Sequence, residues 1–333
     1  MGFASGRFEV AVVGSGKVND GFLGSSSREL GRNYTVRAEP EVGWFFAGWS
    51  GSATSSRESL TFTMEEGLSL TARFIENPFI SRIGIYSGLV QAADPVSATS
   101  GLLKLNLAAK GTFSGELSLG GRSHSLKDRF PGEGFVTLSL PHQSTRLTVT
   151  LQLDISSGAN QITGTVTDGV FVANLTAVQT LAPDALTPLA GRYTIALPAN
   201  AEAVGESLPR GSGCATLSVS KSGQTQLIGF LADAQAFTQT GVISNDGRLP
   251  VYVSLYGGGG SLVGDLIFRE TAGSHCDGVV AWSKPNMPGA RFYPEAFAAA
   301  TGIFGSRYES QSHILNPPSW TFPRLLKIPS CNW

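Results

Sequence analysis

Apolar and polar residues alternate along much of this chain. Between residues 60 and 64, Leu, Phe and Met alternate with Thr, and between residues 68 and 74, Leu, Ala and Phe alternate with polar residues. A period of two sends successive side chains to opposite faces, which is the pattern of a half-buried β-strand. We therefore predict that these two runs are strands of a small β module.

The stretch before these runs, residues 43–51, reads Gly-Trp-Phe-Phe-Ala-Gly-Trp-Ser-Gly. The rings of Trp44, Phe46 and Trp49 provide the large buried area that a small module needs. The glycines between them let the backbone turn tightly around the rings. The sequence thus places the centre of the first module here.

Residues 8–76 resemble the divergent internalin-type B-repeat, a bacterial repeat module of secreted and surface proteins. Four features carry the resemblance: an opening hairpin over 10–18, Tyr-Thr-Val-Arg-Ala-Glu-Pro over 34–40, Gly-Trp-x-Phe-x-Gly-Trp-Ser-Gly over 43–51, and a closing Leu-Thr-Ala-Arg-Phe over 70–74. The resemblance covers about a fifth of the chain and implies a stalk or adhesive spacer. It carries over no catalytic residues.

From residue 82 to residue 181 the pattern predicts about eight short strands. Gly120-Gly121 predicts a hairpin turn between two of them. The clearest alternating runs are 85–90, 103–107, 113–119, 136–140, 147–153, 162–166 and 170–173.

After a linker at 182–188, the same order of motifs returns over 189–304, which indicates an internal duplication. Gly191-Arg-Tyr193 matches Gly84-Ile-Tyr86, and Asp246-Gly247 matches Glu133-Gly134. Gly264-Asp-Leu is matched to Gly164-Thr-Val, and Asp277-Gly278 to Asp168-Gly169. The predicted fold is mostly β: a small β-rich module over 1–77, then two tandem antiparallel β-barrel or β-sandwich domains over 82–181 and 189–304. Closure into barrels removes exposed edges, which favours barrels.

The duplicated region also resembles β-rich duplications found beside such repeat modules in large bacterial surface proteins. That resemblance implies no activity. Residues 292–302 are predicted to form one short helical turn, and 302–308 another opening strand. Residues 305–333 are predicted to be an irregular tail, either a strap over a barrel or, as we favour, the product of a truncated or frame-shifted reading frame.

Composition narrows the range of functions that the chain could have. Of 333 residues, 41% are hydrophobic and only 15% are charged, and the net charge is −1. A chain without basic excess lacks the electrostatic footprint of a nucleic-acid binder. Apolar runs stay shorter than a membrane helix requires, so no membrane span is expected. The amino terminus lacks a signal pattern, and we expect the chain to be a fragment whose export signal lies upstream.

No motif predicts catalysis, a cofactor or a metal. Residues 13–17, Val-Gly-Ser-Gly-Lys, lack the first glycine and the final Ser or Thr of a phosphate loop. Gly48-Trp-Ser-Gly51 is one residue short of a nucleophile elbow. The four histidines are scattered, and Cys214 and Cys276 could pair or remain thiols. We therefore expect no enzyme.

Three aromatic residues of the second repeat, Tyr252, Tyr256 and Trp282, are candidate ligand-binding residues because exposed rings stack on sugars. Tyr252 is out of register with Val251 and Val253, so it is expected to face away from them. The four glycines at 257–260 form either a hairpin connection, which we favour, or a mobile binding loop.

The sequence thus predicts a non-catalytic module of a secreted or cell-surface bacterial protein, located outside the cell and acting as a spacer, adhesin segment or assembly unit. The alternative is a carbohydrate- or small-ligand-binding accessory region of a secreted enzyme. The expected partners are other copies or neighbouring domains of a surface protein, together with glycans.

Overall fold

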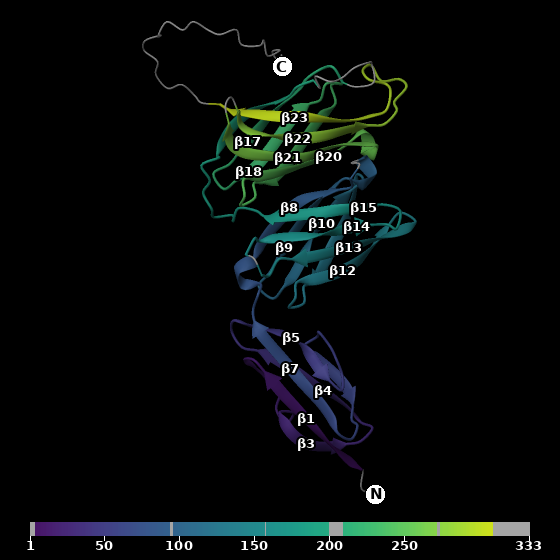
Figure 1. The fold of residues 1–333 in the computed structure, drawn as a ribbon, viewed down its shortest axis with the longest axis vertical. Helices are drawn as coiled ribbons and strands as arrows, with labels where there is room; N and C mark the ends of the chain where they lie inside the picture. Colours follow the sequence, from purple (N-terminus) through teal and green to yellow (C-terminus); the bar gives the residue numbers. More distant parts are fainter. Residues whose placement is uncertain (1–3, 94–95, 157, 200–208, 272–273, 309–333) are drawn as a thin grey trace. The chain divides into compact units, whose positions relative to one another are not determined.

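The computed structural model describes residues 4–93, 96–156, 158–199, 209–271 and 274–308. Within these residues the chain is built almost wholly of β-strands, with three short 3₁₀ turns: η1 (Ile80–Arg82), η2 (Ser97–Thr99) and η3 (Tyr256–Gly258). Figure 1 colours the strands in chain order from purple to yellow. The predicted mostly-β fold class is confirmed.

The N-terminal module contains two small sheets. In the first, the order is β3-β1-β7-β5, formed by β1 (Ser5–Val13), β3 (Gly24–Glu29), β5 (Trp44–Gly51) and β7 (Leu68–Glu76). The second has the order β2-β4-β6, formed by β2 (Gly16–Val18), β4 (Asn33–Pro40) and β6 (Ser59–Thr63). The alternating runs at 60–64 and 68–74 thus coincide with β6 and β7, as predicted.

The predicted opening hairpin over 10–18 is wrong. The chain does turn after β1, where Gly14 has φ +88°. However, β1 pairs in parallel with β7 and antiparallel with β3, whereas β2 pairs with β4 of the other sheet. The turn therefore carries the chain from one sheet to the other, so that both sheets contribute to one core.

Aromatic rings fill that core, as the sequence indicates. Phe46, Trp49 and Phe74 are at most 3% exposed. The ring of Phe46 lies 5.6 Å, between centroids, from those of Trp49 and Phe74, within the range of favourable aromatic pairs. The Trp49 indole N–H donates to the Glu58 carbonyl at 3.2 Å, so its polar atom is satisfied.

Residues 84–179 form an eight-stranded sheet in the order β11-β10-β9-β8-β15-β14-β13-β12. The turn between β10 and β11 contains Gly120 and Gly121, both at positive φ, which is the geometry of a type I′ hairpin. The strands are β8 (Gly84–Gln91), β9 (Gly101–Leu107), β10 (Thr112–Leu119), β11 (Arg122–Arg129), β12 (Phe135–His142), β13 (Thr145–Leu153), β14 (Gln161–Thr167) and β15 (Val172–Gln179).

Residues 191–307 form a second eight-stranded sheet, in the order β19-β18-β17-β16-β23-β22-β21-β20. The place of each strand in this order is the same as in the first sheet. The strands are β16 (Gly191–Leu197), β17 (Gly213–Val219), β18 (Gln224–Phe230), β19 (Ala236–Val242), β20 (Arg248–Leu255), β21 (Gly260–Thr271), β22 (Ser274–Lys284) and β23 (Phe297–Arg307).

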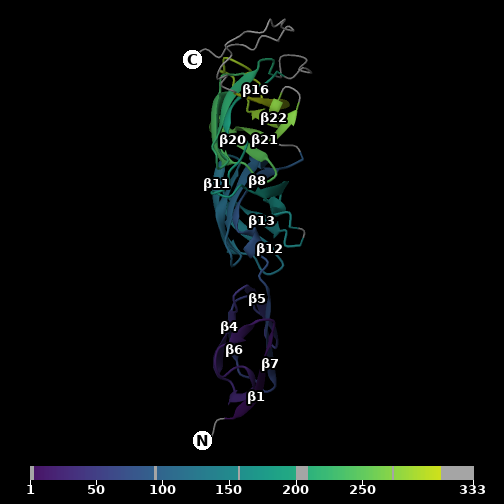
Figure 2. The same ribbon diagram turned by 90° about the vertical axis from the view of Figure 1, so that its left-hand side faces the viewer.

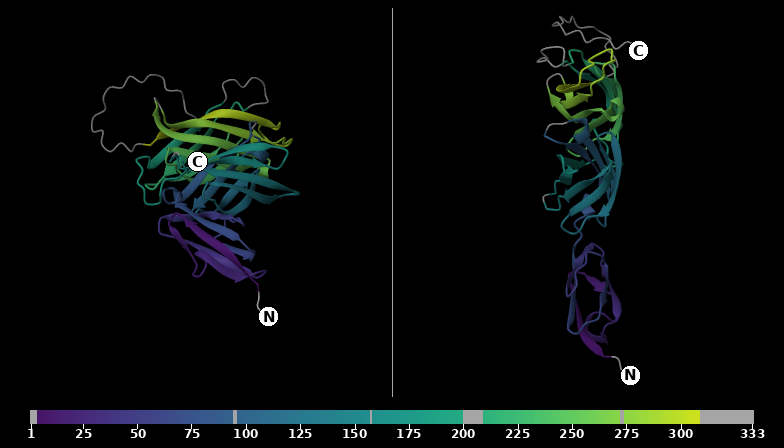
Figure 3. Two further views of the ribbon diagram at one scale, coloured as in Figure 1. Left: turned by 60° about the horizontal axis from the view of Figure 1, so that its bottom comes forward. Right: turned by 90° about the vertical axis from the view of Figure 1, so that its right-hand side faces the viewer.

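Each order describes an up-and-down meander whose first and last strands pair, leaving one unpaired seam between the fourth and fifth strands. Figure 2 shows the second sheet curling back on itself, and Figure 3 shows its curvature from two further sides. The two sheets are therefore nearly closed eight-stranded barrels, and of the two predicted architectures the barrel is the one observed.

The interior of each barrel is filled by side chains, as expected for eight strands. In the second barrel, inward Leu217, Leu262, Val280 and Ile303 are fully buried. Leu105, Leu117, Leu151 and Val166 are likewise buried among the strands of the first.

The duplication is visible in matched hydrogen bonds. The Tyr86 hydroxyl donates to the Arg82 carbonyl at 2.8 Å, and the Tyr193 hydroxyl donates to the Leu189 carbonyl at 2.7 Å, in each case four residues back. Gly134 and Gly247 both have positive φ, and each accepts a hydrogen bond at its carbonyl from the corresponding strand. The donor to Gly134 is the Leu153 N–H of β13, at 2.8 Å, and the donor to Gly247 is the Phe268 N–H of β21, also at 2.8 Å.

Two of the predicted motif matches are wrong. Gly164 lies on β14, so its counterpart must lie on β22, whereas Gly264 lies on β21. The counterpart is Gly278: a Cβ added at Gly164 or at Gly278 would lie 1.9 Å from a carbonyl oxygen of the neighbouring strand. Asp168-Gly169 lies after β14, whereas Asp277-Gly278 lies inside β22, so this match is wrong as well.

The predicted helical turn over 292–302 is also wrong. Residues 297–307 form β23, which pairs with β22 along its length and with β16 near its end. The alanines at 298–300 pair with residues 281–283 of β22, and this pairing outweighs their helical propensity.

Packing divides the chain into two compact units, and the division crosses the first barrel, so the predicted four-part division stays a prediction. Of the predicted tail, residues 309–333 lie outside the described residues. The units are Met1–Tyr86 with Lys104–Glu116 and Ser125–Gly169, and Ser87–Leu103 with Leu117–His124 and Val170–Trp333.

Candidate functional site

Tyr252, the first of the three predicted ligand-binding aromatics, is buried. It faces away from Val251, as predicted, and packs with Leu89, Leu102 and Val263, whereas Val251 belongs to the core of the second barrel. The Tyr252 hydroxyl accepts a hydrogen bond from the Gly121 N–H at 3.0 Å. Its ring and its polar atom are thus both engaged within the protein.

Tyr256 and Trp282, the other two, lie together in the second barrel. The Trp282 indole N–H donates to the Tyr256 hydroxyl at 3.0 Å. Trp282 is 5% exposed, and its ring meets Phe297 edge-on at a centroid distance of 4.8 Å. A ligand-binding role for the three aromatics stays a prediction.

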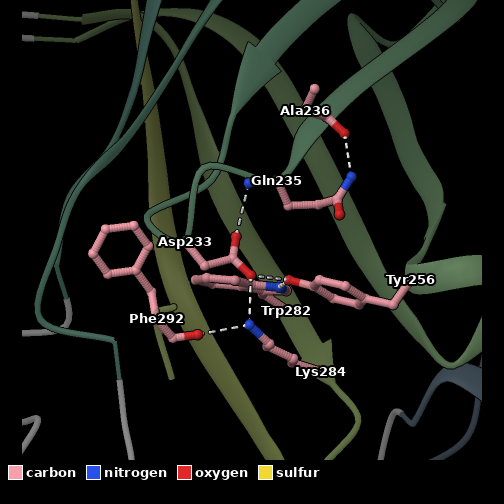
Figure 4. A network of polar contacts seen from close by, with 7 residues as sticks. All are labelled: Asp233, Gln235, Ala236, Tyr256, Trp282, Lys284 and Phe292. Carbon is pink, nitrogen blue, oxygen red and sulfur yellow. Dashed lines mark hydrogen bonds and ion pairs between the residues drawn. The ribbon is translucent and has the colours of Figure 1, made fainter. Parts of the chain in front are cut away.

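These two residues belong to a larger set of polar contacts around a buried carboxylate, drawn in Figure 4. The Tyr256 hydroxyl donates to Asp233 Oδ2 at 2.7 Å. The Lys284 ammonium lies 2.8 Å from the same oxygen, and both of these charged side chains are 3% exposed. We call Asp233, Tyr256, Trp282 and Lys284 the Asp233 network.

Backbone groups complete the bonding. The other carboxylate oxygen of Asp233, Oδ1, accepts the Gln235 N–H at 3.0 Å. Lys284 also donates to the Phe292 carbonyl at 2.9 Å, and its Nζ stands 5.2 Å from the centre of the Tyr256 ring. Hydrogen bonds of this kind are what allow a buried charge pair to persist.

Turns and strand ends position the network. Asp233 lies in the turn between β18 and β19, Tyr256 follows β20, and Lys284 is the last residue of β22. The backbone nearby is strained: Ala234, Tyr256 and Tyr293 have φ of 66°, 51° and 48°. Such conformations cost about 1–3 kcal/mol each when the residue is not glycine and persist where the surroundings enforce them.

The sign of each pKa shift follows from these contacts. Burial acts to raise the pKa of Asp233, but the hydrogen bonds from Lys284, Tyr256 and the Gln235 N–H outweigh it and hold that pKa below its usual value. Burial, together with the Asp233 carboxylate that it faces, raises the pKa of Tyr256. The network therefore holds a carboxylate and a neutral phenol.

Sequence reasoning found Tyr256 and Trp282 but missed Asp233 and Lys284. A signal was present for the lysine. Val280, Trp282 and Lys284 are spaced by two on β22 and share its buried face, at 0%, 5% and 4% exposed. A lysine in register with a buried apolar row needs a partner charge, but nothing in the local sequence identifies that partner.

An apolar pocket lies beside Trp282 at one end of the second barrel. Its enclosed volume is about 20 Å³, room for one water molecule. Leu197, Leu231, Leu262 and Ala299 contribute to its lining.

In the described part of the chain, no three His, Cys, Asp or Glu side chains gather where a metal ion could bind. Cys276 is a free, buried thiol, so it is not paired with Cys214. Burial and the neighbouring Asp277 raise the pKa of Cys276 to about 12. Among the helices that the structure describes, none has the length and apolarity to cross a membrane.

Comparison with known families concerns the N-terminal module. The family model described as the divergent InlB B-repeat domain matches residues 8–78. The family predicted from the Gly-Trp-x-Phe-x-Gly-Trp-Ser-Gly stretch is thereby confirmed. Because this family is typical of bacterial surface proteins, the B-repeat makes the chain resemble a surface-protein module.

Comparison with solved structures gives no guide to function. A crystal structure of a protein of unknown function from the DUF3598 family of Nostoc punctiforme matches with 11% identity, covering 70% of this chain and 98% of the other, at a TM-score of 0.21. No curated protein matches this chain.

Proposed function

We propose that this chain is a non-catalytic module of a secreted or cell-surface bacterial protein, where it acts as a spacer, adhesin segment or assembly unit. The observation that carries the proposal is the B-repeat at residues 8–78. Repeats of this family are typical of surface proteins, and such a repeat adds a folded, aromatic-cored unit rather than a reactive centre.

The interior of the second barrel supports the same role. Leu217, Leu262 and Val280 fill the space that a larger barrel would leave for a ligand. The polar groups of the Asp233 network bond one another and nearby backbone atoms, at distances from 2.7 to 3.0 Å. Their bonding capacity serves to hold turns and strand ends together.

Cell fractionation tests the location. The native protein should be recovered in the medium or cell-envelope fraction of the source bacterium, with a cytoplasmic enzyme as the marker for lysis. Recovery together with the cytoplasmic marker would contradict a surface role.

The second candidate role is that of a ligand-binding accessory region, and the pocket beside Trp282 favours it. Its lining is apolar and its volume is that of one water molecule, so it would take the methyl end of an apolar ligand and not a sugar ring. Titration of Trp fluorescence with a glycan panel and with medium-chain fatty acids distinguishes the classes. No saturable change at millimolar ligand would count against this role, and Leu262→Phe, which fills the pocket, should abolish any change that does occur.

A further inference from the structure

The Asp233 network also contains the two reacting groups of an amide bond. Lys284 Nζ and Asp233 Oδ2 are 2.8 Å apart, and both side chains are 3% exposed. Groups held in this way react with effective molarities of roughly 10⁵–10⁸ M when they are well oriented. Water, which would hydrolyse the product, is largely excluded from the pair.

We propose that Lys284 and Asp233 condense spontaneously to an intramolecular amide cross-link with loss of one water. The proposal goes beyond the function proposed above and does not depend on it. The cross-link joins the turn between β18 and β19 to the end of β22, across 51 positions of sequence.

The reaction is balanced without any external reagent. One proton passes from the ammonium to Oδ2, giving a neutral amine and a carboxylic acid. These neutral forms are the minor state of the pair, because hydrogen bonds hold the pKa of Asp233 low, and the reaction proceeds from them. The nitrogen lone pair then attacks Cγ, and the C=O electron pair moves to Oδ1. As the Cγ–Oδ2 bond breaks, Oδ2 leaves as water with a second proton from the nitrogen. The nitrogen keeps one hydrogen, and the product is a secondary amide.

The neighbours are placed to assist both oxygens. The Gln235 N–H, 3.0 Å from Oδ1, would stabilise the negative charge that develops there. The Tyr256 hydroxyl, 2.7 Å from Oδ2, would stabilise the departing oxygen, and the Trp282 N–H holds that hydroxyl in place at 3.0 Å. Positive φ at Ala234 and Tyr256 is strain located beside the reacting pair.

The chain offers a matched control pair in the B-repeat. Lys17 and Glu39 also place an amine near a carboxylate, at 3.6 Å, but their side chains are 74% and 44% exposed. Water can reach this pair and its geometry is looser, so it should remain two separate side chains.

Mass spectrometry of the purified full chain under denaturing conditions tests the proposal. The chain should be lighter than its sequence mass by one water, and trypsin should release residues 222–248 joined to residues 270–291. The variant Lys284→Arg, which keeps the charge but cannot form this amide, should have its full sequence mass. The Lys17 and Glu39 peptides should be unlinked.

Three results would overturn it. The first is a wild-type mass equal to the sequence mass. The second is a water loss that maps to an unlinked 222–248 peptide, which would identify a cyclised Asp233 rather than a cross-link. The third is an equal loss in Lys284→Arg. Tyr256→Phe provides a kinetic readout: freshly refolded protein should acquire the cross-link more slowly than the wild type, while its final mass change stays the same.

Discussion

The side-chain oxygen of Gln239 accepts a hydrogen bond from the backbone N–H of Tyr252 at 2.8 Å, across the seam between β19 and β20. The same amide donates its N–H to the Pro250 carbonyl at 2.7 Å. One side chain of β19 thus satisfies two backbone groups on the edge of β20, although β19 and β20 do not pair through their backbones. This bonding closes the second barrel at the only gap in its strand order.

Truncation of Gln239 should weaken that closure. Gln239→Ala leaves the Tyr252 N–H and the Pro250 carbonyl without this partner, at a cost of about 1–3 kcal/mol for each buried group left unpaired. Urea unfolding of the full chain measures the loss. Gln226→Ala, at an exposed position on β18, should change stability little. A Gln239→Ala variant as stable as Gln226→Ala would show that the seam does not depend on this side chain.

The paired tyrosines predict equal effects in the two barrels. Tyr86→Phe and Tyr193→Phe each remove one hydroxyl that bonds a carbonyl four residues back. Each substitution should cost about 0.5–1.5 kcal/mol in unfolding free energy. Tyr308→Phe is the control, because Tyr308 is 69% exposed. If only one of the two buried substitutions had an effect, the tyrosines would not be equivalent parts of a duplicated fold.

Gly164 and Gly278 should be intolerant of even a methyl group. A Cβ at either position would lie 1.9 Å from the carbonyl oxygen of Thr150 or Asp265, so the strands must separate. We expect Gly164→Ala and Gly278→Ala each to destabilise by about 1–3 kcal/mol or more. Gly289→Ala, where nothing lies within 4 Å of the added Cβ, should be neutral in the same thermal melts. Similar melting temperatures for all three variants would contradict the register of β13 with β14 and of β21 with β22.

Much of the fold could be predicted from the sequence because it depends on local alternation. Many strands of the barrels follow from the period of two, although β11 has no such alternation. The duplicated Gly-x-Tyr openings follow from matching the two halves of the sequence. The Asp233 network depends instead on one turn residue and one strand-end residue that are 51 positions apart, and no local pattern connects them. The wrong helical prediction for residues 297–301 has the same cause. The alanines at 298–300 favour a helix, and only their pairing with β22, which lies outside this local sequence, makes them part of a strand.

Cys276 should resist alkylation in the folded protein. Its thiol is buried and its pKa is raised to about 12, so almost no thiolate exists at pH 8. Iodoacetamide should label the tryptic fragment that contains Cys276 quickly in urea and hardly at all without it, as mass spectrometry can follow. Equal labelling rates would show that this site opens readily.

The same shift has a consequence for pH. Because the folded pKa of Cys276 lies above that of an ordinary thiol, its contribution to stability is complete below pH 8 and is lost as the pH rises toward about 12. In Cys276→Ala, the fall in stability over this alkaline range should be shallower than in the wild type, whatever the effect of the substitution at neutral pH. A slope unchanged by the substitution would assign the alkaline loss to other groups.

The central claim, that the chain is a surface-protein module, is tested most directly by antibody access on living cells. Antibodies raised against the B-repeat, residues 8–78, should bind intact cells of the source bacterium, and brief treatment of those cells with an external protease should remove the signal. An antibody against a cytoplasmic protein should bind only after permeabilisation. If the B-repeat antibody also binds only after permeabilisation, the surface assignment is wrong.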